Sequence, residues 1–173
     1  MAKRLKGLKK LNKAIAEPLK DRFGISYAEM CNGEFFYSFE DNSIGWTLVE
    51  KGYGAEDFNA FIAERFGYTV TCPFVISLLH EVGHAKNNDD IDGAVYDFCV
   101  REKDRIADAM YEATDREEIR KLNYQYFNLP DEIMATAWAI EYATKHPRIV
   151  KKMWGDMWNA ILKFYEDNNL EED

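Results

Sequence analysis

The chain has 173 residues, of which 47% are hydrophobic and 14% aromatic, a composition that excludes a disordered chain and is typical of one folded domain. Its net charge of −9 is uneven, because residues 1–13 hold six bases and no acid, so that the remainder carries −15. An acidic body of this kind disfavours nucleic-acid binding. We therefore expect a single domain over residues 1–173 with no nucleic-acid partner.

Membrane and secreted classes are also disfavoured by the sequence. The most apolar run, residues 73–79, is far shorter than the roughly 20 residues that span a bilayer. Lysines interrupt the leucines of the first segment, which excludes the apolar core of a secretory signal. Cys31, Cys72 and Cys99 form no CxxC pair and read as ordinary thiols rather than a disulfide framework. We expect a cytoplasmic protein without a membrane partner.

The amino-terminal part of the chain predicts one helix and a hairpin. Leucine and isoleucine recur at helical spacing between lysines over residues 5–15, and Pro18 is expected to end this helix. The aromatic residues 34–40 and the alternating residues 44–48 are separated by turn formers. This pattern predicts a β-hairpin and hence a small antiparallel sheet.

Two helices and a further short strand are expected next. An apolar stripe over residues 58–66 predicts a helix that Gly67 ends, and residues 68–71 are expected to add a third strand. Pro73 suits the first position of the following helix, residues 73–86. A backbone N–H at that position has no partner within the helix, so proline loses no hydrogen bond by lacking one.

The rest of the chain predicts helices only. Thr114 and Glu117 have the spacing of a capping box, and Pro130 marks a helix entry. The fold class is therefore α+β and mostly helical. The predicted helices cover about residues 94–113, 115–127, 131–145 and 148–166.

The segment from His80 to His84 carries the chemistry. It reads His-Glu-Val-Gly-His, and four residues of helix turn through about 400° and rise about 6 Å, so both imidazoles project from nearly one side. Each imidazole can place a nitrogen about 2.0–2.1 Å from a zinc ion. Glu81 lies beside such an ion and can take a proton from its bound water, which predicts hydrolytic chemistry.

Chance placement of these residues on a core helix is the alternative to a metal site. The predicted helix start, the apolar opposite face and Gly83, whose missing side chain permits close packing, favour the metal site. A third ligand is still required, because catalytic zinc usually takes three protein ligands. His146 is too remote in sequence for the HExxHxxGxxH pattern, so we expect a carboxylate.

Glu132 is the best candidate for this carboxylate. Ala135, Thr136 and Ala139 share its helical face and are small enough for a close approach to the metal helix. The alternative is that Glu132 only favours the helix amino terminus through the macrodipole. The weaker candidates are Asp131, Glu141 and the acidic loop Asp89, Asp90 and Asp92.

The two segments together resemble a known family. His80-Glu-Val-Gly-His84, followed by Glu132-Ile-Met-Ala-Thr-Ala-Trp-Ala139, is similar to the ImmA/IrrE family of bacterial and phage metallopeptidases, with HExxH and a later ExxAxx(F/W)A helix. The resemblance implies a zincin-like fold of the gluzincin type, in which His80, His84 and Glu132 hold zinc and Glu81 is the general base. The separation of 48 positions from His84 to Glu132 exceeds the expected gap, so an acidic loop and an extra helix are predicted to fill it.

The sequence thus predicts a zinc-dependent peptidase that hydrolyses a protein or peptide substrate. The alternative is a catalytically silent zinc-binding regulatory or interaction protein on the same fold. Four other residues could donate to the charge that develops in the reaction, although helix-end, core or rim positions explain each of them more simply: His146, Tyr124, Tyr126 and Tyr142.

Overall fold

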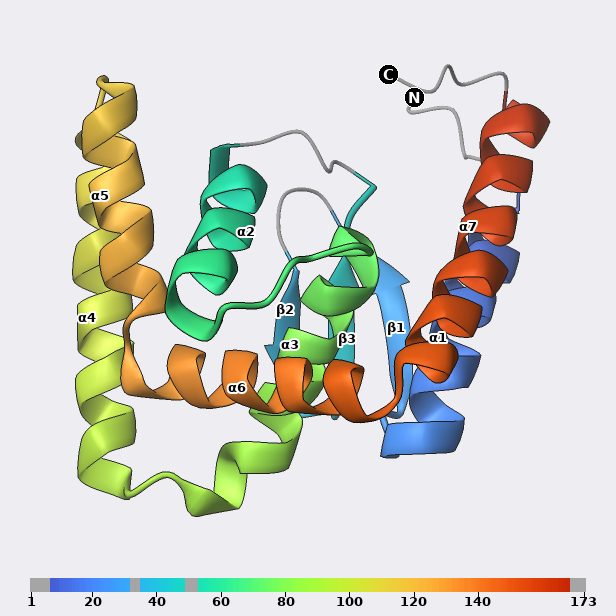
Figure 1. Cartoon of the computed structure of the whole chain (residues 1–173), viewed down its shortest axis with the longest axis horizontal. Coiled ribbons are helices and arrows are strands. Elements are labelled where there is room, and N and C mark those ends of the chain that lie inside the picture. The colour runs from blue at the N-terminus through green and yellow to red at the C-terminus, as the bar shows by residue number, and fades with distance from the viewer. Residues whose placement is uncertain (1–6, 32–34, 49–52, 169–173) are drawn as a thin grey trace. The chain divides into compact units, whose positions relative to one another are not determined.

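The computed structural model describes residues 7–31, 35–48 and 53–168. The chain divides into two compact units, one made of residues 1–48 and 146–173 and the other of residues 49–145. Helices predominate, with one small sheet, which confirms the α+β class (Figure 1). The single domain expected from the sequence stays a prediction.

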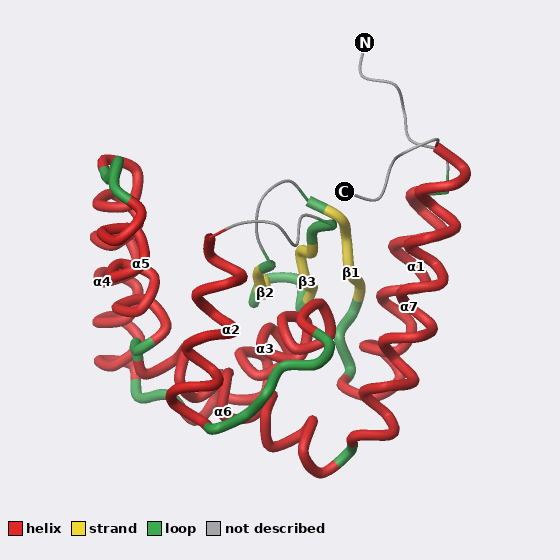
Figure 2. The backbone as a smooth tube through the Cα atoms, turned by 45° about the horizontal axis from the view of Figure 1, so that its top comes forward, coloured by secondary structure: helices red, strands yellow, loops and turns green. Residues whose placement is uncertain are grey.

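Two helices build most of the first unit. Helix α1, Leu8–Phe23, runs beside α7, Pro147–Asn168 (Figure 2). The prediction that Pro18 ends α1 is wrong, because a buried apolar stripe continues past it and Gly24, with φ of 80°, ends the helix instead. The buried stripe consists of Leu11, Ile15, Leu19 and Phe23.

A three-stranded sheet completes this unit, with strand order β1-β3-β2. Strands β2, Phe36–Ser38, and β3, Ser43–Trp46, pair antiparallel and confirm the hairpin. Strand β1, Tyr27–Met30, pairs parallel with β3, so the prediction of an all-antiparallel sheet is wrong. A strand of four residues is too short to show an alternation of apolar and polar residues that could be recognised in the sequence.

The second unit is helical. The prediction of a third strand at residues 68–71 is wrong, because these residues form the loop between α2 and α3 and pair with no strand of the described chain. The other expected helices are present with ends shifted by a few residues. The unit contains α2, Tyr53–Phe66; α3, Pro73–Asn87; the short 3₁₀ helix η1, Asn88–Asp90; α4, Gly93–Glu112; α5, Arg116–Phe127; and α6, Pro130–Lys145.

The amino terminus of α5 differs slightly from the predicted capping box. The side chain of Asp115 accepts a hydrogen bond from the backbone N–H of Glu118 at 3.1 Å, so the cap lies one residue after Thr114. The shift is physically small, because aspartate caps a helix as well as threonine does.

Among the described residues, no helix combines the length and the apolar character that a membrane span requires.

A buried carboxylate ties α2 to α5. Arg116 donates two hydrogen bonds to Asp57, at 2.7 and 2.8 Å, and Asn123 donates a third at 2.8 Å. The hydrogen bonds from Arg116 hold the pKa of Asp57 below its ordinary value, although burial opposes them. This pair fixes α2 and α5 within the unit that carries the candidate metal ligands.

Candidate metal centre

Helices α3 and α6 approach one another very closely. Helix α6 crosses α3 (Figure 1), and a Cβ atom built on Gly83 of α3 would stand 2.4 Å from the backbone oxygen of Ala135 on α6. Ala135 and Ala139 are fully buried in this contact, as their small side chains predicted. Only a residue without a side chain fits at position 83, and this contact brings the two predicted ligand segments together.

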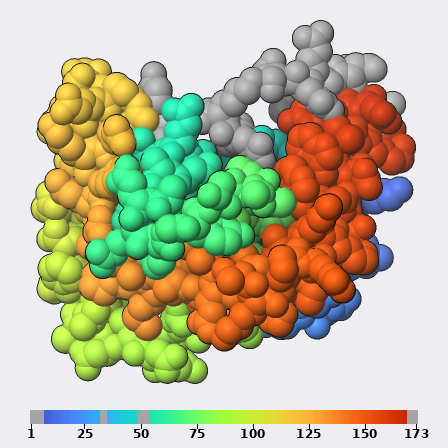
Figure 3. Space-filling view, viewed as in Figure 1, coloured from blue at the N-terminus to red at the C-terminus, as the bar shows by residue number. Residues whose placement is uncertain are grey.

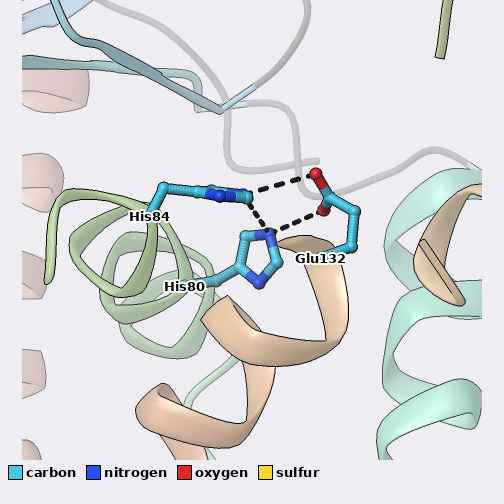
Figure 4. A group of neighbouring side chains, drawn as sticks. All are labelled: His80, His84 and Glu132. Carbon is cyan, nitrogen blue, oxygen red and sulfur yellow. Dashed lines mark hydrogen bonds and ion pairs between the residues drawn. The ribbon is translucent and has the colours of Figure 1, made fainter. Parts of the chain in front are cut away.

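Three side chains converge across this contact. His80 and His84 project from one side of α3 toward Glu132 of α6 (Figure 4). The Nε2 atom of His80 lies 3.0 Å from Oε2 of Glu132 and 3.2 Å from Nε2 of His84, and Nε2 of His84 lies 3.4 Å from Oε1 of Glu132. Within the described chain, this is the one group of histidine, cysteine and acidic residues whose donor atoms could share a metal ion.

The spacing of these atoms fits a small tetrahedral ion. Zinc bonds of about 2.0–2.2 Å at tetrahedral angles separate neighbouring ligand atoms by about 3.3 Å. The two imidazole nitrogens lie 3.2 Å apart, and His80 and His84 lie 3.0 and 3.4 Å from different oxygens of Glu132, distances close to that value. Two imidazole nitrogens and one carboxylate oxygen also form a donor set in keeping with a divalent transition metal. The residues therefore fit a metal ion in both geometry and chemistry.

The candidate ligand atoms lie below the protein surface. His80 is 7% exposed and Glu132 is 3% exposed, whereas His84 is partly exposed. In the space-filling view, atoms of α2 and α6 lie against one another on the face shown (Figure 3). Phe58 of α2 packs edge-on against the ring of His80, with centroids 5.2 Å apart. An ion held here would experience a low local dielectric, which strengthens its attraction to the donors.

Thr136 orients the ring of His80. Its Oγ1 atom lies 3.0 Å from Nδ1 of His80, one helical turn after Glu132 on the same face of α6. When Nδ1 donates its proton to this hydroxyl, Nε2 presents its lone pair toward the other donors, as a metal ligand must. From the sequence, Thr136 was expected only to be small enough for close packing, although its spacing of one turn from Glu132 places it on the same helical face.

Replacing Thr136 by valine is expected to lower zinc affinity about 10- to 100-fold, because the nearly isosteric side chain leaves Nδ1 of His80 without its partner. Competition with a chromophoric zinc chelator measures the change. Thr144→Val is the matched control, since Thr144 lies on the same helix and is exposed. Equal affinity in Thr136→Val and wild type would show that Thr136 does not orient the ligand.

Glu81 lies in the same buried cluster but outside the set of converging donors. It is 7% exposed, and burial raises the pKa of its carboxyl group above the ordinary value, while His80 and His84 partly oppose this. A carboxyl group whose pKa is raised toward neutrality is a better proton acceptor. Glu81 therefore lies beside the candidate ligands, and its role as a general base stays a prediction.

The electrostatics of the cluster favour an ionised Glu132. Burial alone would raise the pKa of this carboxyl group, but hydrogen bonds from His80 and His84 outweigh burial and hold the pKa well below its ordinary value. Burial would likewise lower the pKa of His84, and Glu132 reverses that effect and raises it. Glu132 is thus a charged acceptor that attracts cations, whether protons on the imidazoles or a metal ion.

A lysine that the sequence analysis did not single out adjoins Glu132. Lys103 of α4 lies with its Nζ atom 2.5 Å from Oε1 of Glu132 and 2.5 Å from Oδ2 of Asp131. Burial would lower the pKa of Lys103, but Glu132 and the other nearby groups raise it above its ordinary value. The signal in the sequence was a lysine on the core stripe of α4, one turn after the buried Cys99 and three residues before the buried Ile106.

The weaker candidates occupy other positions. Asp131 is buried but pairs with Lys103, and Glu141 is exposed and pairs with Lys145. Residues 88–90 of the acidic loop form η1 and are exposed. Tyr142 stacks on Trp138. Tyr126 lies with its ring 5.3 Å from Nζ of Lys103.

Two further predicted residues have ordinary roles or lie elsewhere. Tyr124 packs edge-on against Phe61, and His146 belongs to the other unit. All three cysteines are free thiols, and Cys72 and Cys99 are buried as expected, whereas Cys31 is only half-buried. No protein-family model, no curated protein and no solved structure matches the chain.

Proposed function

We propose that this chain is a zinc-dependent peptidase. One observation carries the proposal: His80, His84 and Glu132 converge from two tightly packed helices, while Glu81 lies among them without joining the donor set. Three protein ligands and a separate carboxylate are the parts of a hydrolytic zinc site. A purely structural zinc site would ordinarily use four protein ligands.

Zinc is proposed over other cations because of the donor chemistry. Calcium and magnesium prefer six or more oxygen ligands, whereas two imidazoles and one carboxylate suit zinc. When bound, the ion would polarise the scissile carbonyl and acidify the attacking water. Glu81 would accept the proton of that water and pass it to the leaving amine, and Thr136 and Lys103 would keep the ligands in place.

The resemblance to the ImmA/IrrE family supports the same proposal. Both of its segments, residues 80–84 and 132–139, lie in the α3–α6 contact. The proposal therefore includes membership of that family, a zincin-like fold, a cytoplasmic location and a protein or peptide substrate.

Metal content of the purified protein tests the proposal most directly. We expect about one zinc per chain in wild type and loss of most of it in Glu132→Ala, since two histidines alone make an incomplete site. Glu141→Ala is the control, because Glu141 lies on the same helix and is exposed. Mass spectrometry of metals and thermal melting with added zinc give stoichiometry and stabilisation. Wild-type protein that neither contains zinc nor is stabilised by it would refute the proposal.

Burial of the centre supports a second candidate, a zinc-binding regulatory protein without turnover. His80 and Glu132 are almost inaccessible within their own unit, and substrate must reach a catalytic ion. Cobalt substitution separates the two candidates, because a catalytic ion keeps an exchangeable position. Azide or a hydroxamate added to the cobalt form shifts its visible spectrum if that position exists. An unchanged spectrum favours the silent protein.

A further inference from the structure

Glu132 has two oxygens in different environments. Oε2 faces His80 at 3.0 Å, whereas Oε1 contacts both His84, at 3.4 Å, and the ammonium group of Lys103, at 2.5 Å. The same ammonium group contacts Asp131 at 2.5 Å. Lys103 therefore bridges two consecutive carboxylates at the start of α6.

The position of Lys103 is unusual for a lysine. Its side chain is only 26% exposed and lies on the core stripe of α4, where Cys99 and Ile106 are buried. Lysines are rarely buried unless they are paired with an acidic group. Lys103 follows this rule, because Asp131 and Glu132 compensate its charge. Helix α4 also belongs to the long segment between the two candidate ligand motifs.

We propose that Lys103 is a positioning residue that occupies Oε1 of Glu132 and so restricts this carboxylate to a single bond, through Oε2, with the metal ion. The inference rests on the proposed metal site. An ammonium group on one oxygen competes with an ion for that oxygen, and the other oxygen stays available. With two imidazoles and one carboxylate oxygen as ligands, a fourth position remains for water or substrate.

The charge balance supports this arrangement. Glu81, Asp131 and Glu132 are buried together, and Lys103 is the ammonium group that the structure places against two of them. The ammonium group of Lys103 compensates negative charge on the adjacent pair Asp131 and Glu132, and a divalent cation would add further compensation. Without Lys103, Asp131 and Glu132 would lie side by side in a buried site with the ion as their remaining compensation.

Affinity alone would be an ambiguous test. Loss of Lys103 removes a repelling charge from the ion, which strengthens binding, but it also releases Glu132 from its fixed position, which weakens binding. The coordination number is a sharper readout, since a merely structural ion pair would not change it. Cobalt in place of zinc reports it, because four-coordinate cobalt absorbs visible light much more strongly than five- or six-coordinate cobalt.

The experiment compares cobalt-loaded wild type with Lys103→Met and Lys103→Arg. We expect strong four-coordinate absorption in wild type, loss of most of it in Lys103→Met as Glu132 binds through both oxygens, and recovery in Lys103→Arg, which restores a donor. X-ray absorption at the zinc edge should show a coordination number that rises from four to five in Lys103→Met. An unchanged spectrum and coordination number in a metal-loaded Lys103→Met protein would overturn the inference.

Two additions keep the test decisive if Lys103→Met fails to fold. The double variant Lys103→Met with Asp131→Asn removes the carboxylate that would otherwise be left buried and unpaired, and the same spectral loss is expected. Wild-type zinc X-ray absorption needs no variant, and both carboxylate oxygens at bonding distance would contradict the inference. Wild type that binds no metal would instead refute the proposed function, so the two failures are distinguishable.

Discussion

Glu81→Gln is expected to lower peptide hydrolysis by about 10²- to 10⁴-fold while zinc content stays at the wild-type level. Glutamine keeps the size of the side chain but cannot accept the proton of the attacking water. Glu81 is outside the converging donors, so its replacement leaves the three ligands unchanged. Burial raises the pKa of the wild-type carboxyl group, which strengthens it as a proton acceptor, and the amide does not titrate.

A library of quenched fluorescent peptides, which covers many cleavage sequences at once, measures the rate. Chelation must first abolish wild-type turnover, which shows that the activity requires the metal. Glu141→Gln on the exposed face of α6 changes the net charge equally and should retain full rate. Turnover by Glu81→Gln at the wild-type rate would remove Glu81 from the mechanism. Loss of zinc in this variant would make it a ligand instead.

The convergence of the three candidate ligands was predictable because it follows largely from local geometry. Helical periodicity places residues four apart on one side, so His80 and His84 needed no tertiary information. Glu132 required one further step, the small side chains of Ala135 and Ala139 on its face, and both are buried in the α3–α6 contact. Such patterns can be recognised in the sequence because the residues that form them lie on one face of a single helix.

The parts that were missed depend on contacts between distant segments. Lys103 meets Glu132 across 29 positions of sequence, and nothing local specifies which acid a lysine will face. Strand β1 pairs parallel with β3 through backbone groups that every residue possesses, so the side chains of β1 give little indication of this pairing. The helix α1 continued through Pro18 because burial of Leu19 and Phe23 outweighs the lost hydrogen bond.

Gly83→Ala is expected to destabilise the metal-free protein by about 1–3 kcal/mol, toward the upper end of that range. The new Cβ would lie 2.4 Å from the backbone oxygen and 2.8 Å from the Cα of Ala135. Backbone atoms cannot rotate away as a flexible side chain can, so α3 and α6 must separate. Helix propensity alone predicts the opposite sign, since alanine in a helix interior is favoured over glycine by about 1 kcal/mol.

Gly155→Ala is the matched control because Gly155 lies within α7 and a Cβ there would meet no atom within 4 Å. This variant should gain about 0.5–1 kcal/mol, so the two substitutions are expected to shift urea unfolding midpoints in opposite directions. Separation of α3 from α6 also moves Glu132 away from the histidines, so Gly83→Ala should bind zinc more weakly than Gly155→Ala. If Gly83→Ala were as stable as wild type, the two helices could not be in the close contact that brings the three ligands together.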